Sequence, residues 1–196
     1  MRQNRIVLLL PLTVMVFLFI FGYLTINQAQ SITNEELNEH IEFQLEVTTN
    51  ENIPHALGRW NWLDFPEDGM LGHGIIEFII LNENMKPIEF TERLGFLQLL
   101  QSSDVIFAVE DSFFTQEGIA LTFENDIDEN TMFGPKGLAI LDLTELDERA
   151  VFLEVKYYHT WDEQQYTPIE GEEVIESLEA QGIYQYWVIE RSMRLP

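Results

Sequence analysis

The chain opens with an unbroken apolar run from Ile6 to Ile26 that contains no charged residue. At about 1.5 Å of rise per residue, a helix of this length spans roughly 30 Å, the thickness of the hydrocarbon core of a bilayer. A helix also satisfies its own backbone hydrogen bonds, which lipid cannot do. The pattern therefore predicts a transmembrane helix over residues 6–26.

Beyond this run, strand-like patterns dominate. From His40 to Thr48 apolar and polar residues alternate strictly, which is typical of a strand with one buried face. Ile75 to Leu81 is almost continuously apolar and predicts a strand covered on both sides, and Pro87 confines Ile88 to Phe90 to a sheet edge. Further strands are expected over Val105 to Val109, Gly118 to Phe123 and Ile183 to Arg191, and a hairpin over Leu138 to Leu143 and Val151 to Trp161.

Two segments have helical spacing. Leu94, Leu97 and Leu100 predict a short helix from Thr91 to Gln101, and a second helix is expected from Glu172 to Gln181. About eight strands and two short helices favour a mainly β fold, an antiparallel β-sandwich of the immunoglobulin-like kind. The alternative is an α+β layer in which both helices pack on one face of a curved sheet.

The charges that flank the apolar run predict its direction. Arg2 and Arg5 precede it, whereas the next basic residue is Arg59, so the positive-inside rule keeps the N-terminus in the cytoplasm. The expected organisation is a cytoplasmic N-terminus (1–5), a transmembrane signal anchor (6–26), a stalk (27–39) and an acidic β-rich extracytoplasmic domain (40–196). The alternative is a cleaved signal peptide and secretion of the rest, although signal peptides usually have shorter apolar regions.

Composition limits the classes of partner that the protein can bind. Two of the 10 basic residues precede the run and all 34 acidic residues follow it, so the part beyond Ile26 carries a formal charge of −26. Such a surface repels nucleic acids, which excludes a nucleic-acid partner. The chain has no cysteine, which rules out disulfides, zinc–thiolate sites and cysteine catalysis and is typical of a bacterial cell-membrane protein that does without disulfides.

One acidic stretch resembles a metal-binding loop. Asp126, Asp128 and Asn130 have the spacing of the first ligands of a calcium loop. The match then fails, because Thr131 stands where the loop needs glycine and Gly137 where it needs a bidentate glutamate. An acidic hairpin turn is the simpler interpretation, and calcium is the only cofactor that the sequence brings into consideration.

A second candidate site surrounds His73, which lies between Gly72 and Gly74. Flanking glycines are typical of a mobile, accessible loop, and three carboxylates lie upstream, so an acid–base or metal site is one hypothesis. Turn chemistry explains the glycines equally well. The upstream carboxylates are Asp64, Glu67 and Asp68.

Aromatic residues offer a third candidate. Trp60 and Trp62 are two residues apart and share a face on a strand, so they could form a stacking platform. Core packing is the favoured role for the aromatic residues as a group. These two tryptophans are the best candidates for exposure, because they adjoin the glycine-rich segment around His73.

The sequence thus favours a binding or accessory module at the bacterial cell surface, contacting an envelope protein or a wall polymer through the loops around Trp60 to Gly74. A hydrolase or metal-dependent enzyme centred on the segment from Asp64 to His73 is the first alternative. A structural subunit of a membrane complex is the second. No residue has a motif that assigns it a catalytic role.

Overall fold

The computed structural model of the protein describes residues 14–20, 39–50, 53–64, 70–92, 95–128, 131–144, 146–162 and 164–196. The chain divides into two compact units, Met1–Thr33 and Asn34–Pro196. In the first unit, residues 14–20 are helical, and the rest of the apolar run, including Ile6 and Ile26, lies outside the described residues. No helix among the residues described is long and apolar enough to cross a bilayer. The transmembrane anchor stays a prediction.

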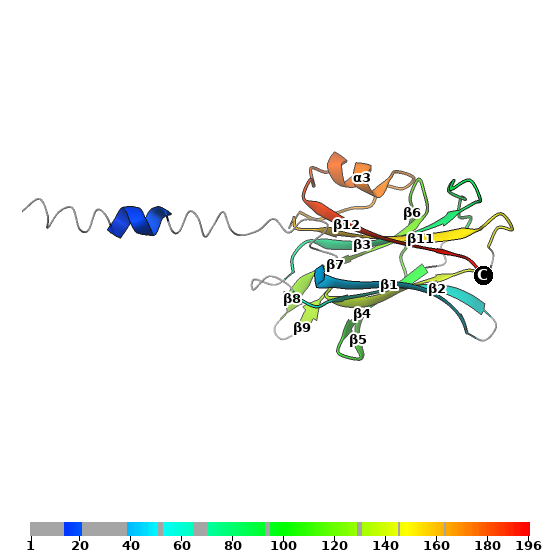
Figure 1. The fold of residues 1–196 in the computed structure, drawn as a ribbon, viewed down its shortest axis with the longest axis horizontal. Helices are drawn as coiled ribbons and strands as arrows, with labels where there is room; N and C mark the ends of the chain where they lie inside the picture. The colour runs from blue at the N-terminus through cyan, green and yellow to red at the C-terminus, as the bar shows by residue number, and fades with distance from the viewer. Residues whose placement is uncertain are drawn as a thin grey trace, which may run out of the picture. The chain divides into compact units, whose positions relative to one another are not determined.

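The second unit is built from two five-stranded sheets in which every neighbouring pair is antiparallel. Figure 1 shows them as two stacked layers, which confirms the predicted antiparallel sandwich. The first sheet has the order β1 (Ile41–Asn50), β2 (Ile53–Trp62), β10 (Lys136–Asp142), β4 (Gly95–Gln101) and β5 (Asp104–Val109). The second has the order β12 (Tyr186–Arg194), β11 (Phe152–Thr160), β3 (His73–Leu81), β7 (Ile119–Glu124) and β6 (Phe113–Phe114). A separate hairpin joins β8 (Asp126–Asp128) to β9 (Thr131–Phe133).

Alternation along the strands builds the core between the sheets. In β1, Ile41 and Phe43 are buried whereas Glu42 and Gln44 are exposed, as the sequence pattern predicts. Burying one such side chain contributes about 1.5–3 kcal/mol. Burial of apolar residues from both sheets therefore holds the two layers together.

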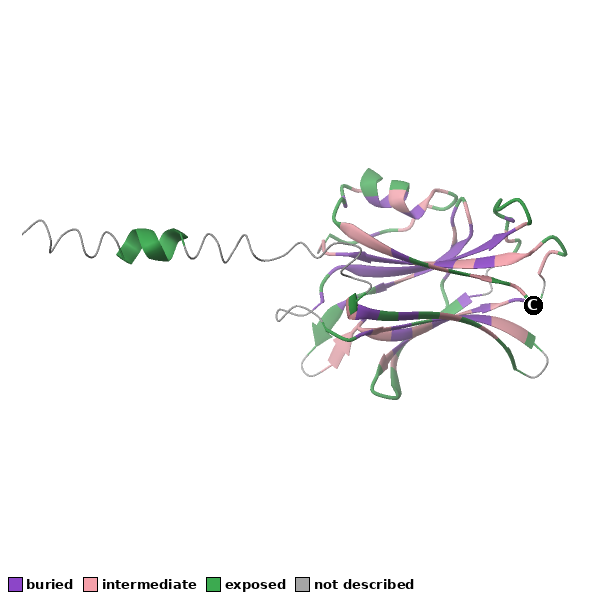
Figure 2. Ribbon diagram, in the orientation of Figure 1, coloured by how far each residue is buried: buried purple, intermediate pink, exposed green. Residues whose placement is uncertain are grey.

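β3 is buried along its whole length because both of its faces are covered. Ile76 and Phe78 face the other sheet and belong to the main core. Ile75 points the opposite way, into a second cluster with Val174 and Leu178 of α3 (Val174–Ala180). Figure 2 shows buried residues both between the sheets and beneath α3. The near-continuous apolar run of this strand is thus explained and its prediction confirmed.

The predicted helix from Glu172 to Gln181 is confirmed as the shorter α3. Just beyond it, Gly182 has φ +84°, a left-handed conformation that favours glycine. The N–H of Gly182 donates to the carbonyl of Glu179 over 3.0 Å, which satisfies one of the last free carbonyls of the helix.

The helix predicted from Thr91 to Gln101 is wrong. The segment contains β4, in which Leu97 and Leu99 are buried at a spacing of two residues. Leucines at positions 97 and 100 fit a helical period, whereas those at 97 and 99 fit a strand period. Pairing with β10 and β5 decides between them, because it satisfies the backbone on both sides of β4.

The predicted hairpin is also wrong. β10 pairs with β2 and β4 in the first sheet, whereas β11 pairs with β3 and β12 in the second. The segment between them therefore crosses from one sheet to the other. The expected edge strand from Ile88 to Phe90 is reduced to one isolated bridge, between Leu81 and Pro87, beside which Ile88 donates its N–H to the carbonyl of Ile80.

Candidate ligand-binding site

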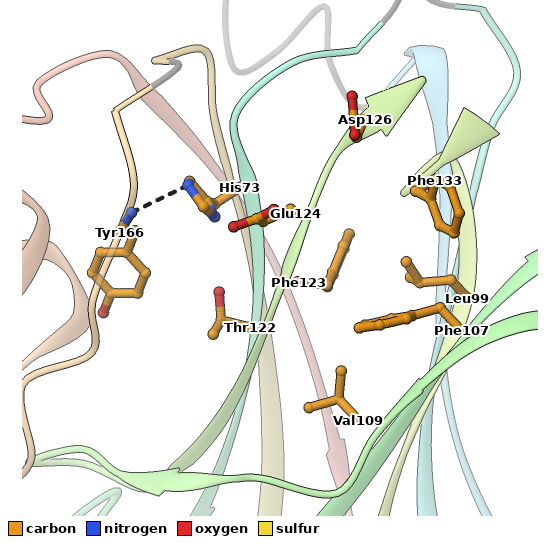
Figure 3. A pocket seen from close by; sticks show the side chains of 10 residues that line it. All are labelled: His73, Leu99, Phe107, Val109, Thr122, Phe123, Glu124, Asp126, Phe133 and Tyr166. Atoms are coloured by element: carbon orange, nitrogen blue, oxygen red, sulfur yellow. Dashed lines mark hydrogen bonds between the residues drawn. The ribbon is translucent and has the colours of Figure 1, made fainter. Parts of the chain in front are cut away.

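A cavity of about 520 Å³ opens where the two sheets meet beside β7. This volume lies within the range of small-molecule pockets in proteins, roughly 300–1,000 Å³. Figure 3 shows two unlike walls. The apolar wall consists of Leu99, Phe107, Val109, Phe123 and Phe133, and the polar wall of His73, Thr122, Glu124, Asp126 and Tyr166.

Strand alternation in β7 places residues on both walls. Phe123 faces inward and is buried, and its ring stacks on that of Trp60 with a centroid separation of 5.1 Å. Thr122 and Glu124 point to the opposite face, where Glu124 is the register partner of His73 on β3. Successive side chains of this strand therefore build opposite sides of the cavity.

The apolar wall continues on the first sheet. Phe107 of β5 is 45% exposed, although it is aromatic. Its ring meets that of Phe133 of β9 edge to face, with centroids 6.5 Å apart and an interplanar angle of 89°. Such a pair keeps an apolar surface in contact with the cavity.

His73 is a buried and fixed member of the polar wall. Its Nε2 accepts a hydrogen bond from the backbone N–H of Tyr166 over 3.1 Å, and its own N–H donates to Oγ1 of Thr160 over 2.9 Å. Burial lowers the pKa of His73, and the Glu124 carboxylate and the backbone carbonyl of Gln164 offset only part of this effect. The imidazole is therefore neutral at pH 7.

The charged groups of the cavity are all acidic. Glu124 and Asp126 line it, and no lysine or arginine of the described chain does. Both carboxylates also border an adjoining hollow that contains Asn125 and Gln165. A ligand that enters here meets negative charge on one side and aromatic surface on the other.

One edge of β7 is open beside the cavity. The strand β6 pairs only with Ile119 and Ala120, so within the described residues no strand lies beside Leu121 to Glu124 on that side. The N–H of Asn125 donates to the carbonyl of Gly72 on the β3 side. Backbone groups of successive residues point alternately toward and away from the partner strand, so this bond shows which residues of β7 direct theirs toward β3. By that alternation, the N–H and C=O groups of Thr122 and Glu124 point away from β3 and toward the open edge.

The structure brings only part of the predicted His73 site together. Asp64 is exposed, and its carboxylate lies 4.0 Å from Nδ1 of His40 rather than on the cavity wall at His73. Glu67 and Asp68 lie outside the described residues. The carboxylate whose charge raises the pKa of His73 is that of Glu124.

The expectation of a mobile, accessible loop at His73 is wrong, because the flanking glycines serve close packing. Gly72 has φ +86°, and a Cβ atom there would lie 2.2 Å from the carbonyl oxygen of Thr160. A Cβ atom on Gly74 would lie 2.1 Å from the ring of Phe123. Both distances are far below van der Waals contact.

Trp60 and Trp62 are core residues, which confirms the favoured core-packing role and contradicts the alternative that they form an exposed platform. Trp60 is 1% exposed and Trp62 is 5% exposed. Each indole N–H has a partner inside the core, the carbonyl of Gly134 at 2.8 Å for Trp60 and the hydroxyl of Tyr157 at 3.2 Å for Trp62. The two side chains do share a face, as predicted, but that face points inward and offers no stacking platform.

The acidic stretch forms the predicted hairpin, with Asp126 and Asp128 on β8. Both aspartates are exposed, and Asp126 accepts a hydrogen bond from the N–H of Ile127 over 2.7 Å. Among the residues that the structure describes, no three His, Cys, Asp or Glu side chains form a group that could hold a metal ion. Asn130 lies outside the described residues. These observations give the calcium prediction no support.

Two further buried polar groups lie near the site. Glu77 of β3 is 1% exposed and accepts hydrogen bonds from Thr115 at 2.5 Å and Tyr158 at 2.6 Å, yet burial still raises its pKa. His159, in the main core, packs edge-on against Trp62 and Trp161, and burial lowers its pKa to about 3.

Sequence patterns missed most of the cavity. Glu124 stood out only as a member of an acidic stretch, and neither Phe107 nor Tyr166 lies in a recognisable motif. A sequence signal for the cavity was available in Phe107 and Val109. Both are apolar although they lie on a short edge strand, where charged residues are usual.

The fold and the cavity together define a two-sheet antiparallel sandwich with an amphipathic pocket at an open strand edge. A scan against protein-family models and a search of curated proteins found no match to the chain.

Proposed function

We propose that this protein is a non-catalytic binding module, held at the bacterial cell surface by residues 6–26, and that its ligand site is the cavity beside β7. The observation that carries the proposal is the contrast between the aromatic pair of exposed Phe107 and partly buried Phe133 and the acidic rim of Glu124 and Asp126. Exposed aromatic surface beside a few convergent polar groups is the usual composition of a ligand site.

The chemistry of His73 favours binding over catalysis. A general base needs a free lone pair within reach of a substrate proton. The Nε2 lone pair of His73 already accepts the hydrogen bond from Tyr166, and Asp64 is not among the residues that line the cavity. We therefore place the hydrolase alternative below the binding role.

We further propose that the sandwich is immunoglobulin-like. In a seven-stranded immunoglobulin domain, strands A, B, E and D form one sheet and strands C, F and G the other. The orders β1-β2-β10-β4 and β3-β11-β12 correspond to these sheets with the strands in the same sequence order. The remaining strands, β5 to β9, are then insertions, and some of them build the cavity.

Site-specific photo-cross-linking in cells tests the ligand site. A photoreactive phenylalanine analogue replaces Phe107 in one full-length variant and Phe96 in another. Phe96 is the matched control, because it is also a partly exposed phenylalanine of the first sheet but does not line the cavity. We expect a defined cross-linked product from position 107 and none from position 96. Equal products from both positions, or none from either, would overturn the proposal.

The cellular location is tested separately. The proposed topology predicts that protease added to intact spheroplasts degrades the domain beyond residue 39 while a cytoplasmic marker survives. Protection of the domain until the membrane is lysed would contradict an outward-facing anchor.

A further inference from the structure

We infer that the open edge of β7 binds an extended, positively charged peptide segment, which joins the second sheet as an additional strand. This inference rests on the proposed function, because it specifies what the cavity beside β7 holds. Three features carry it: the direction of the backbone groups, the unlike walls of the cavity, and its charge.

Among the residues that the structure describes, no strand pairs with the outer backbone groups at the end of β7. The N–H and C=O groups of Thr122 and Glu124 point toward the cavity, and β6 ends its pairing at Ala120. An open strand edge is a template for main-chain pairing with another chain. Leu121 to Glu124 extends roughly 13 Å at about 3.3 Å per residue, so a short segment suffices to fill it.

The walls of the cavity specify alternate side chains of that segment. In an antiparallel pair, residues opposite each other point to the same face of the sheet. A residue opposite Phe123 therefore points inward, toward Phe107 and Val109 on the apolar wall. A residue opposite Thr122 or Glu124 points outward, beside the Glu124 carboxylate.

The charge of the site selects a basic segment. Glu124 and Asp126 line the cavity without a lysine or arginine among the described lining residues, and the whole chain carries a formal charge of −24. Lysine or arginine at the outward positions would pair with these carboxylates, and the field of the whole domain would attract such a segment.

A second copy of this chain fits the edge poorly. Pairing of two β7 edges would bring the acidic rims of two copies, each with a formal charge of −24, close to each other, and like-charge repulsion opposes such an approach. The ligand we infer is therefore a segment of another polypeptide, in which apolar and basic residues alternate.

A titration with synthetic peptides tests the inference. The full chain in zwitterionic detergent is titrated calorimetrically with the end-blocked heptapeptide Lys-Val-Lys-Phe-Lys-Val-Lys. Two matched peptides serve as controls, one with glutamate in place of every lysine and one with N-methyl groups on the two lysines that flank phenylalanine. We expect each control to bind at least about tenfold more weakly, because the first loses charge pairing and the second loses hydrogen bonds to the edge.

Protein variants give an independent test. Thr122→Pro removes the N–H that points to the open edge and leaves the bonds between β7 and β3 in place. Thr122→Val is its control, because valine keeps the N–H and the branched shape. We expect Thr122→Pro to bind the heptapeptide at least about tenfold more weakly than Thr122→Val, because only the proline variant loses the backbone donor.

Three results would overturn the inference: no binding of the heptapeptide, equal binding of the N-methylated peptide, or equal binding of the glutamate peptide. If Thr122→Pro fails to fold, the peptide comparison on the unaltered chain still decides. A cross-link from position 107 combined with equal binding of the N-methylated peptide would retain the cavity as the ligand site and reject strand addition.

Discussion

The backbone N–H of Tyr166 donates a hydrogen bond to Nε2 of His73 over 3.1 Å and so joins the segment between β11 and α3 to the first residue of β3. The bond fixes the orientation of the imidazole and holds the Tyr166 ring against it, with centroids 6.3 Å apart. The bond thereby holds the polar wall of the cavity in place. Under the proposed binding function, preorganisation of this kind would lower the ordering cost of binding.

Two glycines with the same kind of backbone conformation are expected to respond differently to alanine. Gly72 and Gly182 both have positive φ, but a Cβ atom on Gly182 meets nothing within 4 Å, whereas one on Gly72 meets the carbonyl of Thr160. Gly182→Ala should cost about 1–2 kcal/mol of unfolding free energy from strain alone. Gly72→Ala should cost clearly more. Denaturant unfolding measures both, and equal losses would show that the close approach at Thr160 is absent.

Trp60 is expected to be a major contributor to stability. Its ring stacks on Phe123 and Tyr157, and a Cβ atom on Gly137 would collide with it, so the indole fills a closely packed space. Trp60→Ala should lower the unfolding free energy by about 3–5 kcal/mol. Denaturant unfolding followed by circular dichroism checks this. A midpoint near that of the unaltered chain would mean that the side chain is not core.

Tyr158→Phe is expected to destabilise the protein more at high pH than at low pH. Burial raises the pKa of Glu77 in the folded state, so protonation of this carboxyl favours folding as the pH falls through that pKa. Ionised Glu77 needs the Tyr158 hydroxyl as a hydrogen-bond donor, so removal of the hydroxyl should lower the unfolding free energy by about 1.5–3 kcal/mol near pH 8. The decrease in unfolding free energy should be smaller near pH 5. Unfolding at both values tests this, and a loss independent of pH would contradict it.

His159 should make the protein less stable in acid. Its folded pKa is about 3, below its unfolded value of 6.5, so the unfolded chain binds the extra proton. The stability that this histidine contributes is present above pH 6.5 and is lost progressively as the pH falls toward 3.

The variant His159→Phe isolates this effect and keeps an aromatic ring in the same space. Between pH 6.5 and 5, the unaltered chain should lose about 2 kcal/mol relative to the variant. Paired unfolding curves at the two pH values measure the difference. Parallel pH profiles for the two proteins would show that His159 is not held neutral in the fold.

Strand positions were largely predictable because one local pattern decides them. The alternation in β1 and the continuous apolar run of β3 each reflect which faces are covered. Local pattern could not decide between strand and helix at Leu97, because Leu97 and Leu100 fit a helical period whereas Leu97 and Leu99 fit a strand period. The choice is made by pairing with β10 and β5. Closeness in sequence also led to the wrong prediction that β10 and β11 form a hairpin, because tertiary packing places these consecutive strands in different sheets.

The cavity was less predictable than the fold because distant segments build it. Leu99, Phe123 and Tyr166 come from β4, β7 and the segment after β11, and no local spacing relates them. His73 was identified as a site residue from its flanking glycines. Those glycines instead allow close packing against Thr160 and Phe123.

Amide hydrogen exchange at single-residue resolution tests the central claim most directly. In the free full-length chain, the N–H groups of Leu121 and Phe123 should be protected by their bonds to β3, whereas those of Thr122 and Glu124 should exchange rapidly. Saturation with the lysine-containing heptapeptide should protect Thr122 and Glu124 as well. Equal protection of all four amides before the peptide is added, or no change at Thr122 and Glu124 when it is bound, would contradict strand addition at β7.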